Sequence, residues 1–537
     1  MRTRTMRTRT MRAMSELLDA RGRTRRTLIL TGAAAMAGWA GRAPALAMRD
    51  VPGADPFTLG VASGDPHADG VVLWTRLAPQ PLAADGFGGM PARRVHVRWT
   101  LATDEACTKV ARTGDVSADP AAAHSVHVEV RGLTPGREYF YRFEAMGHRS
   151  RIGRTRTAPG LGGGAAAAGP ARFGVVSCAR YESGYFTAYG HLAAERPDLV
   201  LHLGDYVYEY AGTPKSVRPF EAPETTTLAG YRNRYALYRT DPDLQTLHAT
   251  APFAVVWDDH EVDNNWAGEV PEDGQTREQF LARRAVAFQA YYEMMPLRGV
   301  ARPAGSSARL YRQIAWGDLA SICMLDTRQF RDDQPCGDGN KPACEARLDQ
   351  ARQMLGPVQE GWLRERAARS RAIWDVLGQQ VFFGELVRPL PDGRDALPMD
   401  SWNGYVAARG RVLDMYTTRP HNLVVLTGDV HRHFAGTLHA GGGPADAPVV
   451  GTEFVATSVT SAGDGSDDGA AVQALLGRNP NLRFSADRRG YLLADITPST
   501  WTTHFRTVPW VTRAAAPVQT RASFVVEAGR PGLNRLS

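Results

Sequence analysis

The chain has 537 residues, too many for one ordinary hydrophobic core, and its hydrophobic content of 43% is that of a packed globular protein. Its formal net charge is +7, but residues 1–47 contain ten arginines against Glu16 and Asp19, a net of +8. The rest of the chain is therefore close to neutral, which excludes a nucleic-acid-binding function argued from charge.

Residues 1–47 have the pattern of an export signal. Arg25 and Arg26 lie in a TRRTLIL segment that resembles a twin-arginine signal, and residues 27–40 form a short, weakly apolar stretch. The sequence Ala45-Leu46-Ala47 is a candidate cleavage site, and the apolar part is too short for a permanent membrane anchor. We expect export by the twin-arginine machinery to the periplasm, the cell wall or the exterior. A basic disordered tail is the alternative.

Residues 48–158 have the pattern of an all-β domain. Glycine, proline and aspartate separate short runs of alternating apolar side chains at 70–77, 93–101 and 125–133. The segment GLTPGREYFYRF (132–143) resembles the strand entry of a fibronectin-like sandwich, and a generic hairpin is the alternative. We predict a fibronectin-like β-sandwich over 48–158. Residues 159–170 (PGLGGGAAAAGP) cannot form a core, and we interpret them as a linker.

From residue 171 onward, buried strand-like runs alternate with helical patterns, for example at 281–295 and 358–370. This alternation predicts an α/β domain over 171–537. A polar cluster follows each of four apolar runs, at 173–177, 198–203, 253–257 and 422–427. The carboxyl ends of neighbouring buried strands are where α/β sheets build their sites. Residues from four separated segments indicate a two-metal hydrolase centre.

The first two clusters supply Cys178, Asp205 and Tyr208. Asp205 comes after a buried run, and an aspartate there can bridge two cations through its two oxygens. Tyr208 could bind the same metal as a phenolate, which requires a strong Lewis acid such as ferric iron, and Cys178 could add a thiolate. Taken singly, each of these residues could equally be an ordinary core or turn residue.

The third cluster, Trp257 to Glu261, places three acids and an imidazole at one strand end. So much charge is costly there unless metals or a polar site offset it. We expect Asp259 to bind the second metal and His260 to give a proton to a leaving oxygen. Asn264 or Asn265 could add a neutral oxygen suited to calcium. A solvated acidic loop is the alternative.

Two arginines follow a further buried run that ends before Asp326. Arg328 or Arg331 could make the forked contact to phosphate oxygens that a guanidinium forms well. A surface salt bridge is the alternative for either one.

The five cysteines fit an exported protein. Cys336 and Cys344 flank a polar loop, GDGNKPA, and we predict a disulfide between them, with two free thiols as the alternative. Cys323 lies in an apolar run and is expected to be a buried core thiol.

The last cluster contains Asp429 and His431. In an extended chain, residues two apart face the same direction, so both side chains can approach one metal pair. Asp429 suits the harder metal and His431 the softer one, and His433 is expected to lie behind them.

Over nearly the whole chain after the export signal, the sequence resembles the PhoD-like alkaline phosphatase family of the calcineurin-like metallophosphoesterase superfamily. The motifs that carry the resemblance are Ser177-Cys178, Gly204 to Glu209, Trp257 to Val262, Leu325 to Gln329, Asp333 to Asp338 and Gly428 to His431. One departure is visible, because Ala179-Arg180 stands where the family often has glutamine after the cysteine. The departure affects what surrounds Cys178 rather than the ligand itself.

The resemblance implies a two-sheet α/β-β/α catalytic core that follows the sandwich domain. It implies ferric iron (Fe3+) held by Cys178, Asp205, Tyr208 and His431. It also implies calcium (Ca2+) near Asp205, Asp429 and one residue of 259–265, either Asp259 or Asn265.

The implied activity is hydrolysis of phosphate monoesters and diesters by a metal-bound hydroxide, with Arg328 offsetting charge on phosphate and His260 protonating the leaving group. We expect a monomer that acts on phosphate esters. Three alternatives remain: a phospholipase D-type diesterase, a catalytically silent protein that binds the cell wall or a polymer, and a redox-active iron enzyme.

Overall fold

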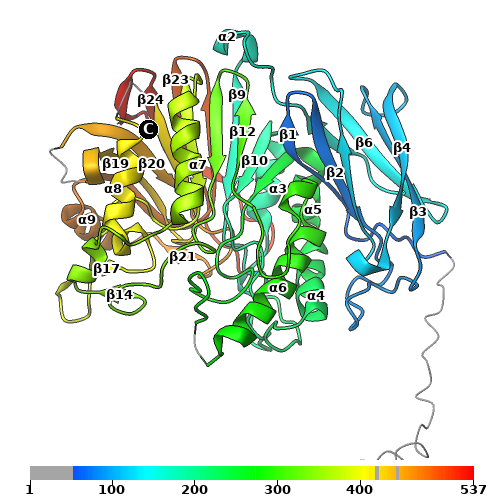
Figure 1. Cartoon of the computed structure of the whole chain (residues 1–537), viewed down its shortest axis with the longest axis horizontal. Coiled ribbons are helices and arrows are strands. Elements are labelled where there is room, and N and C mark those ends of the chain that lie inside the picture. Colours follow the sequence, from blue (N-terminus) through cyan, green and yellow to red (C-terminus); the bar gives the residue numbers. More distant parts are fainter. Residues whose placement is uncertain (1–52, 273, 418–421, 443–446) are drawn as a thin grey trace, which may run out of the picture. The chain divides into compact units, whose positions relative to one another are not determined.

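A computed structural model describes residues 53–272, 274–417, 422–442 and 447–537 (Figure 1). The expected export signal over 1–47 lies outside the described residues. Within the described ranges, no helix combines the length and the apolarity needed to cross a membrane.

The N-terminal part of the described chain consists mainly of strands. One set contains β1 (Val61–His67), β2 (Gly70–Arg76) and β5 (Ser125–Val130). The other contains β3 (Val95–Ala102), β4 (Val110–Ala118), β6 (Glu138–Ala145), β7 (His148–Arg149) and β8 (Gly153–Arg156). Alternating side chains of both sets, such as Leu73, Val97 and Tyr141, pack into one apolar cluster. The first set is not a separate sheet, because β1 also pairs in parallel with a strand of the main sheet, whereas the second set forms a five-stranded sheet of its own.

The segment that the sequence suggested as a linker is held against its surroundings. The carboxylate of Asp318 accepts hydrogen bonds from the backbone N–H groups of Gly162 and Gly164, at 3.0 and 2.7 Å. A short helix, α2 (Ala165–Ala168), follows, and Ala168 is buried. The physical reason is that alanine, unlike glycine, has a methyl group that can join a core.

The first main sheet is mixed. Three parallel strands lie side by side: β9 (Ala171–Val176), β10 (Leu199–His202) and β11 (Pro252–Val255). Beyond β9 the sheet continues in antiparallel fashion through β22 (Leu482–Ile496), β23 (Thr500–Val508), β24 (Gln519–Glu527) and β25 (Arg530–Arg535).

The second main set of strands has β15 (Trp374–Gln379) and β18 (Leu423–Thr427) at its centre. They are flanked by β12 (Arg312–Trp316), β13 (Ala320–Met324), β20 (Val449–Val455) and β19 (His433–His439). The long strand β22 links the two sets, because its first part pairs with β19 and its last part with β9. A short strand, β21 (Gly465–Ser466), also pairs with β22.

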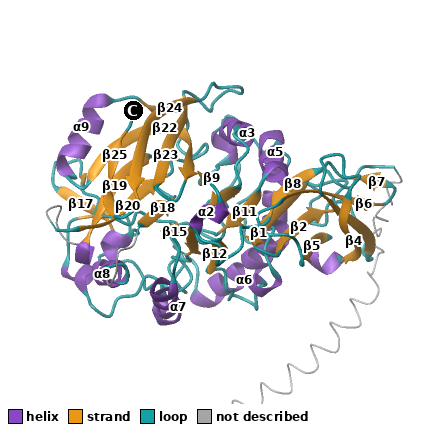
Figure 2. Cartoon of the chain, turned by 90° about the horizontal axis from the view of Figure 1, so that it is seen from above, coloured by secondary structure: helices purple, strands orange, loops and turns teal. Residues whose placement is uncertain are grey.

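The described helices are α3 (Thr187–Ala194), α4 (Leu228–Arg239), α5 (Pro242–Thr250), α6 (Arg277–Met294), α7 (Gly356–Arg369), α8 (Val406–Asp414) and α9 (Gly469–Arg478). Helices α3 and α5 lie on the opposite side of the strands from α7 and α8 (Figure 2). The patterns at 281–295 and 358–370 correspond to α6 and α7. Helix α6 begins earlier than predicted because Thr276 and Gln279 form a capping box.

Two glycines let the strand ends of both sets meet. Gly204 has φ of 103°, and a Cβ there would lie 2.4 Å from the side chain of Asp258. A Cβ on Gly428 would lie 2.9 Å from Ser177 and 3.0 Å from the carbonyl of Leu203. Only glycine permits approaches this close. The loops after β9, β10, β11 and β18 therefore converge at one place.

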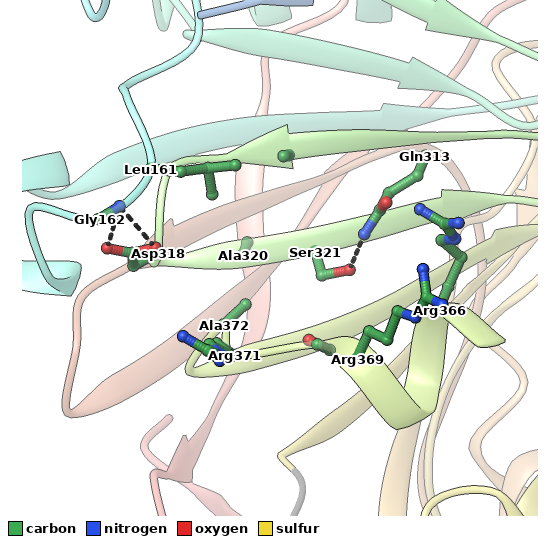
Figure 3. Close-up of a pocket in the computed structure, with 13 residues that line it drawn as sticks. Leu161, Gly162, Gln313, Asp318, Ala320, Ser321, Arg366, Arg369, Arg371 and Ala372 are labelled. Carbon is green, nitrogen blue, oxygen red and sulfur yellow. Dashed lines mark hydrogen bonds between the residues drawn. The ribbon is translucent and has the colours of Figure 1, made fainter. Parts of the chain in front are cut away.

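A cavity of about 450 Å³ lies elsewhere, between the β12–β13 hairpin and the end of α7 (Figure 3). Its lining includes Gln313 hydrogen-bonded to Ser321, and the arginines 366, 369 and 371. None of the candidate site residues lines it.

Candidate metal centre

The strand-end loops bring the acidic, thiol and imidazole groups into one continuous cluster. Within the described residues, three groups have ligand atoms within 4.8 Å of one another: Cys178 with Asp205 and His431, Asp205 with Asp259 and His260, and Asp258 with Asp259 and Asp429. Asp205 belongs to the first two groups and Asp259 to the last two. An arrangement with shared carboxylates can hold adjacent cations.

Several site residues have an unusual backbone conformation. The φ angle is positive at Cys178 (59°), Asp205 (55°), Asn265 (49°), Asp429 (61°) and His431 (57°). Side-chain-bearing residues adopt this left-handed region only rarely, and such strain is concentrated at functional sites. These sharp turns aim the side chains back over the strand ends.

The first group is built around the phenol of Tyr208. Its hydroxyl donates to Asp205 Oδ2 at 2.8 Å, lies 3.2 Å from His431 Nε2 and accepts a hydrogen bond from Ser461 Oγ at 2.7 Å. Burial and the neighbouring Asp205 carboxylate raise the pKa of both Tyr208 and Cys178. A bound cation would reverse this effect by stabilising the phenolate and the thiolate.

The second group contains His260 between two acids. Glu209 Oε2 contacts His260 Nδ1 at 2.9 Å, and His260 Nε2 lies 4.0 Å from Asp259 Oδ2. Burial disfavours the imidazolium, but Asp259, Glu209 and Asp205 outweigh this effect and raise the pKa of His260. The centroid of its ring lies 4.1 Å from that of Tyr208, with the two planes tilted by 31°. Glu209 thus occupies Nδ1 and leaves Nε2 on the side of Asp259.

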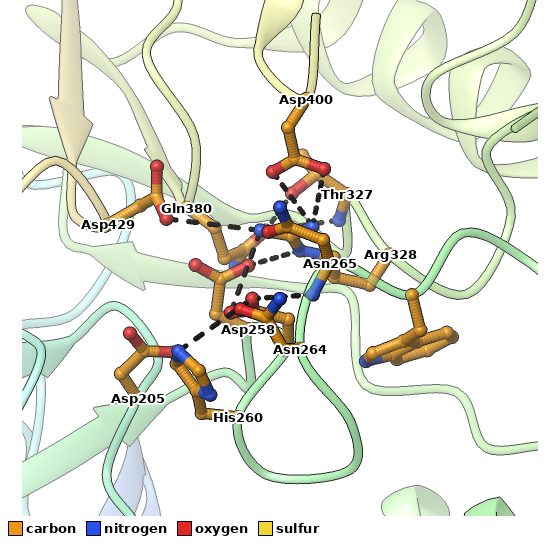
Figure 4. Close-up of polar contacts among 12 residues, drawn as sticks. Asp205, Asp258, His260, Asn264, Asn265, Thr327, Arg328, Gln380, Asp400 and Asp429 are labelled. Atoms are coloured by element: carbon orange, nitrogen blue, oxygen red, sulfur yellow. Dashed lines mark hydrogen bonds and ion pairs between the residues drawn. The ribbon is translucent and has the colours of Figure 1, made fainter. Parts of the chain in front are cut away.

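The third group surrounds Arg328, which is fully buried (Figure 4). Arg328 Nε donates to Asp258 Oδ1 at 2.5 Å and Nη1 to Asp400 Oδ1 at 2.9 Å. Nη2 lies 3.6 Å from Asp259 Oδ1 and 4.0 Å from Asp429 Oδ1, without a hydrogen-bond partner. Two of its three nitrogens are thus occupied by Asp258 and Asp400, and Nη2 is left buried beside Asp259 and Asp429 without a hydrogen-bond partner among the described residues. The other candidate, Arg331, is tied to Asp400 and to backbone carbonyls.

Unpaired oxygens test whether the cluster fits metal ions. Asp205 Oδ1, Asp258 Oδ2 and Asp259 Oδ1 are buried and have no hydrogen-bond partner among the described residues. Burying a charged oxygen without a partner is costly, and bound cations would offset that cost. Burial accordingly raises the pKa of Asp205 and Asp258, and that of Asp429 to about 7. The donor set of carboxylates, thiol, phenol and imidazole fits metal ions.

The structure distinguishes between the two asparagines. Asn265 donates its backbone N–H to Asp259 Oδ2 at 2.8 Å. Asn264 instead directs its side-chain amide to Glu272 at 2.6 Å. The backbone of Asn265 thus contacts a carboxylate of the cluster, whereas the backbone N–H of Asn264 binds Glu209, the partner of His260, at 2.9 Å.

Sequence reasoning missed several members of the site. Asp258 was visible in the third motif but was given no role. Glu261, in the same motif, accepts the backbone N–H groups of Asp205, Tyr206 and Asp258 at 3.1, 2.6 and 2.8 Å. Asp400 and Ser461 lie in loops without a recognisable motif, and only their position in space reveals them.

The structure pairs Cys336 with Cys344 in a disulfide, and Cys107, Cys178 and Cys323 are buried free thiols. His433 is buried behind the cluster, where its Nδ1 accepts the backbone N–H of Thr457 at 3.1 Å.

Comparisons with known proteins agree with this geometry. The profile of the PhoD-like phosphatase family matches residues 173–505, and that of the N-terminal domain of PhoD-like phosphatases matches residues 41–159. Alkaline phosphatase D of Bacillus subtilis (strain 168) is 47% identical over 491 residues, 90% of this chain and 82% of that protein. The solved structure of PhoD superposes with a TM-score of 0.86 at 46% identity and covers 90% of this chain and 93% of its own.

Proposed function

The chain belongs to the PhoD-like phosphatase family and is a phosphoric ester hydrolase, and we propose that it is an exported, metal-dependent enzyme for phosphate monoesters and diesters. The observation that carries this proposal is the set of unpaired buried oxygens on Asp205, Asp258 and Asp259. Because Asp205 and Asp259 are each shared between two groups, two adjacent metal ions fit the cluster better than one.

We propose different metals for the two ends of the cluster. A thiolate, a phenolate and an imidazole favour a transition metal, which supports ferric iron at Cys178, Asp205, Tyr208 and His431. Carboxylate and amide oxygens favour a hard cation, which supports calcium at Asp205, Asp259, Asp429 and Asn265. When bound, these ions would act as Lewis acids that turn water into a nucleophile near neutral pH.

The chain supplies the remaining chemistry. His260 is fixed through Nδ1 by Glu209, which leaves Nε2 as the nitrogen that can give a proton to the leaving oxygen. Arg328 keeps Asp258 in place and offers Nη2 to the charge that develops on the phosphate oxygens.

The test uses the purified protein with p-nitrophenyl phosphate and bis-p-nitrophenyl phosphate as substrates. The Asp205→Ala variant should lose one metal per chain and at least about a hundredfold in kcat/KM on both esters. A calcium chelator should stop hydrolysis by the native protein while its iron stays bound. Asp392→Ala, on an exposed hairpin turn, is the matched control. Unchanged hydrolysis by a folded Asp205→Ala protein would refute the proposal.

We also propose that the protein is exported by the twin-arginine pathway and acts as a monomer. Arg25 and Arg26 and the sequence Ala45-Leu46-Ala47 support the first part. Replacing both arginines with lysine should retain the protein in the cytoplasm, and the exported native protein should begin at Met48. Sedimentation of the exported protein should give the mass of one chain.

A further inference from the structure

The loop closed by the Cys336–Cys344 disulfide reaches the metal cluster through one carboxylate. Asp338 Oδ2 accepts a hydrogen bond from Asn265 Nδ2 at 2.6 Å, and Asp338 Oδ1 accepts one from the backbone N–H of Gly339 at 2.6 Å. Asp338 is exposed, so it is not part of the buried cluster itself. Its contact is with the asparagine whose backbone binds Asp259.

The contact with Asp338 decides which way the amide of Asn265 faces. A carboxylate can only accept hydrogen bonds, so the NH2 group of Asn265 must face Asp338 and its carbonyl oxygen must face away from it. Within the described part of the chain, Asn265 Oδ1 accepts no hydrogen bond, whereas the backbone carbonyl of Asn265 accepts from Gln334 at 2.6 Å and from Arg331 at 3.2 Å. The side-chain oxygen is therefore available as a neutral ligand.

The loop that carries Asp338 is itself anchored. Its strand β14 (Asn340–Lys341) pairs with β17 (Asp395–Pro398), which also pairs with β16 (Arg388–Pro389). Met399 donates its N–H to Gly339 O at 3.0 Å, and the next residue is Asp400, the partner of Arg328. The disulfide spans only eight positions and limits the movement of Asp338 between its two cysteines.

We propose that Asp338 is a positioning residue that orients Asn265 Oδ1 as a calcium ligand, and that the Cys336–Cys344 disulfide holds Asp338 in the place where it can do so. This inference rests on the proposed function, because the cation is the calcium of that site. It assigns the disulfide loop a part in metal affinity in addition to its part in stability. Loss of an outer partner of a metal ligand typically lowers affinity by about 10- to 100-fold.

The experiment measures calcium binding directly, by calorimetric titration of the full-length, iron-loaded protein without substrate. Asp338→Ala should raise the calcium dissociation constant at least about tenfold. Asp338→Asn keeps one oxygen that can accept the hydrogen bond from Asn265 Nδ2. The backbone N–H of Gly339, which binds the other oxygen in the native protein, is exposed and can bind water instead. The calcium dissociation constant of this variant should therefore stay within about threefold of the native value. Asp392→Ala removes one charge from the turn between β16 and β17 without touching Asn265, and should bind calcium as the native protein does.

The Cys336→Ser/Cys344→Ser double variant tests whether the disulfide holds Asp338 in place. It is preferred to a reductant, because a reductant would also reduce the ferric iron. The variant should lose affinity in the same range as Asp338→Ala. At saturating calcium, all variants should recover the native kcat, and their iron content should not change. If the serine variant does not fold, Asp338→Ala still decides the role of Asp338.

Two results would overturn the inference. One is an Asp338→Ala protein with native calcium affinity. The other is an equal loss in Asp338→Ala and Asp338→Asn, because that would show that the charge matters rather than the orientation of Asn265. Failure of the proposed function looks different: the native protein would bind calcium and respond to Asp338→Ala, yet hydrolyse neither ester.

Discussion

The Glu261 carboxylate accepts the backbone N–H of Asp205 at 3.1 Å, across 56 positions of the chain. The same carboxylate accepts the N–H groups of Tyr206 and Asp258. Glu261 thus fastens the loop after β10 to the loop after β11, and these are the two loops that carry the shared carboxylates Asp205 and Asp259. The geometry of the cluster thus depends on a residue that belongs to none of the three groups of ligand atoms.

Glu261→Gln should therefore disturb both stability and metal binding. The glutamine side chain keeps one acceptor oxygen, but its NH2 group replaces the second oxygen and faces a backbone N–H. A buried donor is then left without an acceptor, which costs about 1–3 kcal/mol. Urea unfolding and metal analysis measure the two effects. Glu269→Gln, at an exposed ion pair with Arg277, should change the unfolding free energy by less than about 0.5 kcal/mol. Equal stability of the two variants would contradict this role of Glu261.

Ser461→Ala should change the colour of the iron-loaded protein. Ser461 Oγ donates a hydrogen bond to the Tyr208 oxygen, and such a bond withdraws electron density from a phenolate bound to ferric iron. Without it, the phenolate-to-iron charge-transfer band should move to longer wavelength. Thr460→Val removes a neighbouring hydroxyl that contacts only the carbonyl of Arg180, and its spectrum should match that of the native protein. An unshifted band in the Ser461 variant would argue against phenolate ligation.

The metal-free protein should lose stability as the pH rises from about 6.5 to about 8. Burial raises the pKa of Asp429 from 3.8 to about 7 and that of Glu261 from 4.5 to about 8. At these pH values the folded state holds protons that the unfolded state has released. The contribution of the two acids to the free energy of unfolding is therefore complete below their ordinary pKa values, and it is lost as the pH rises through their folded-state pKa values. His431, whose pKa burial lowers from 6.5 to about 3, acts in the opposite sense, but only below pH 6.5.

Thermal unfolding of chelator-treated protein checks this prediction. The loss should be at most about 1.4 kcal/mol per pH unit for each acid. Added calcium should remove it, because a cation replaces the protons, and Asp429→Asn should make the dependence shallower. A metal-free protein that gains stability over this range would contradict the prediction.

Arg328→Ala should destabilise the fold by about 3–5 kcal/mol, because it leaves the carboxylate of Asp258 without its buried counter-charge and Asp400 with Arg331 as its remaining arginine partner. Any loss of hydrolysis in that variant must therefore be compared with its unfolding curve. Arg369→Ala, which breaks an exposed pair with Glu365 on α7, should change stability by less than about 0.5 kcal/mol. Native stability in the Arg328 variant would show that bound cations alone balance the acids.

Much of the site could be predicted because its signals are local. Asp205, Asp259 and Asp429 each lie two residues after the end of an apolar run, and a buried strand followed by a sharp polar turn can be recognised within about ten residues. Asp400 and Ser461 gave no such signal. Their importance comes only from their neighbours, Arg328 and Tyr208, which are distant in the sequence.

The sequence by itself determined the family, the strand and helix pattern from residue 171 onward and most of the ligand-type residues, because these depend on short-range periodicity and on motifs. Tertiary structure alone decided that β22 links the two sets of strands and brings the loop after β18 beside those after β9 and β10. It also decided that Arg328 is buried among acids and that Asp338 orients Asn265. These relationships join residues tens to hundreds of positions apart, so they follow from how the whole core packs and not from any local pattern.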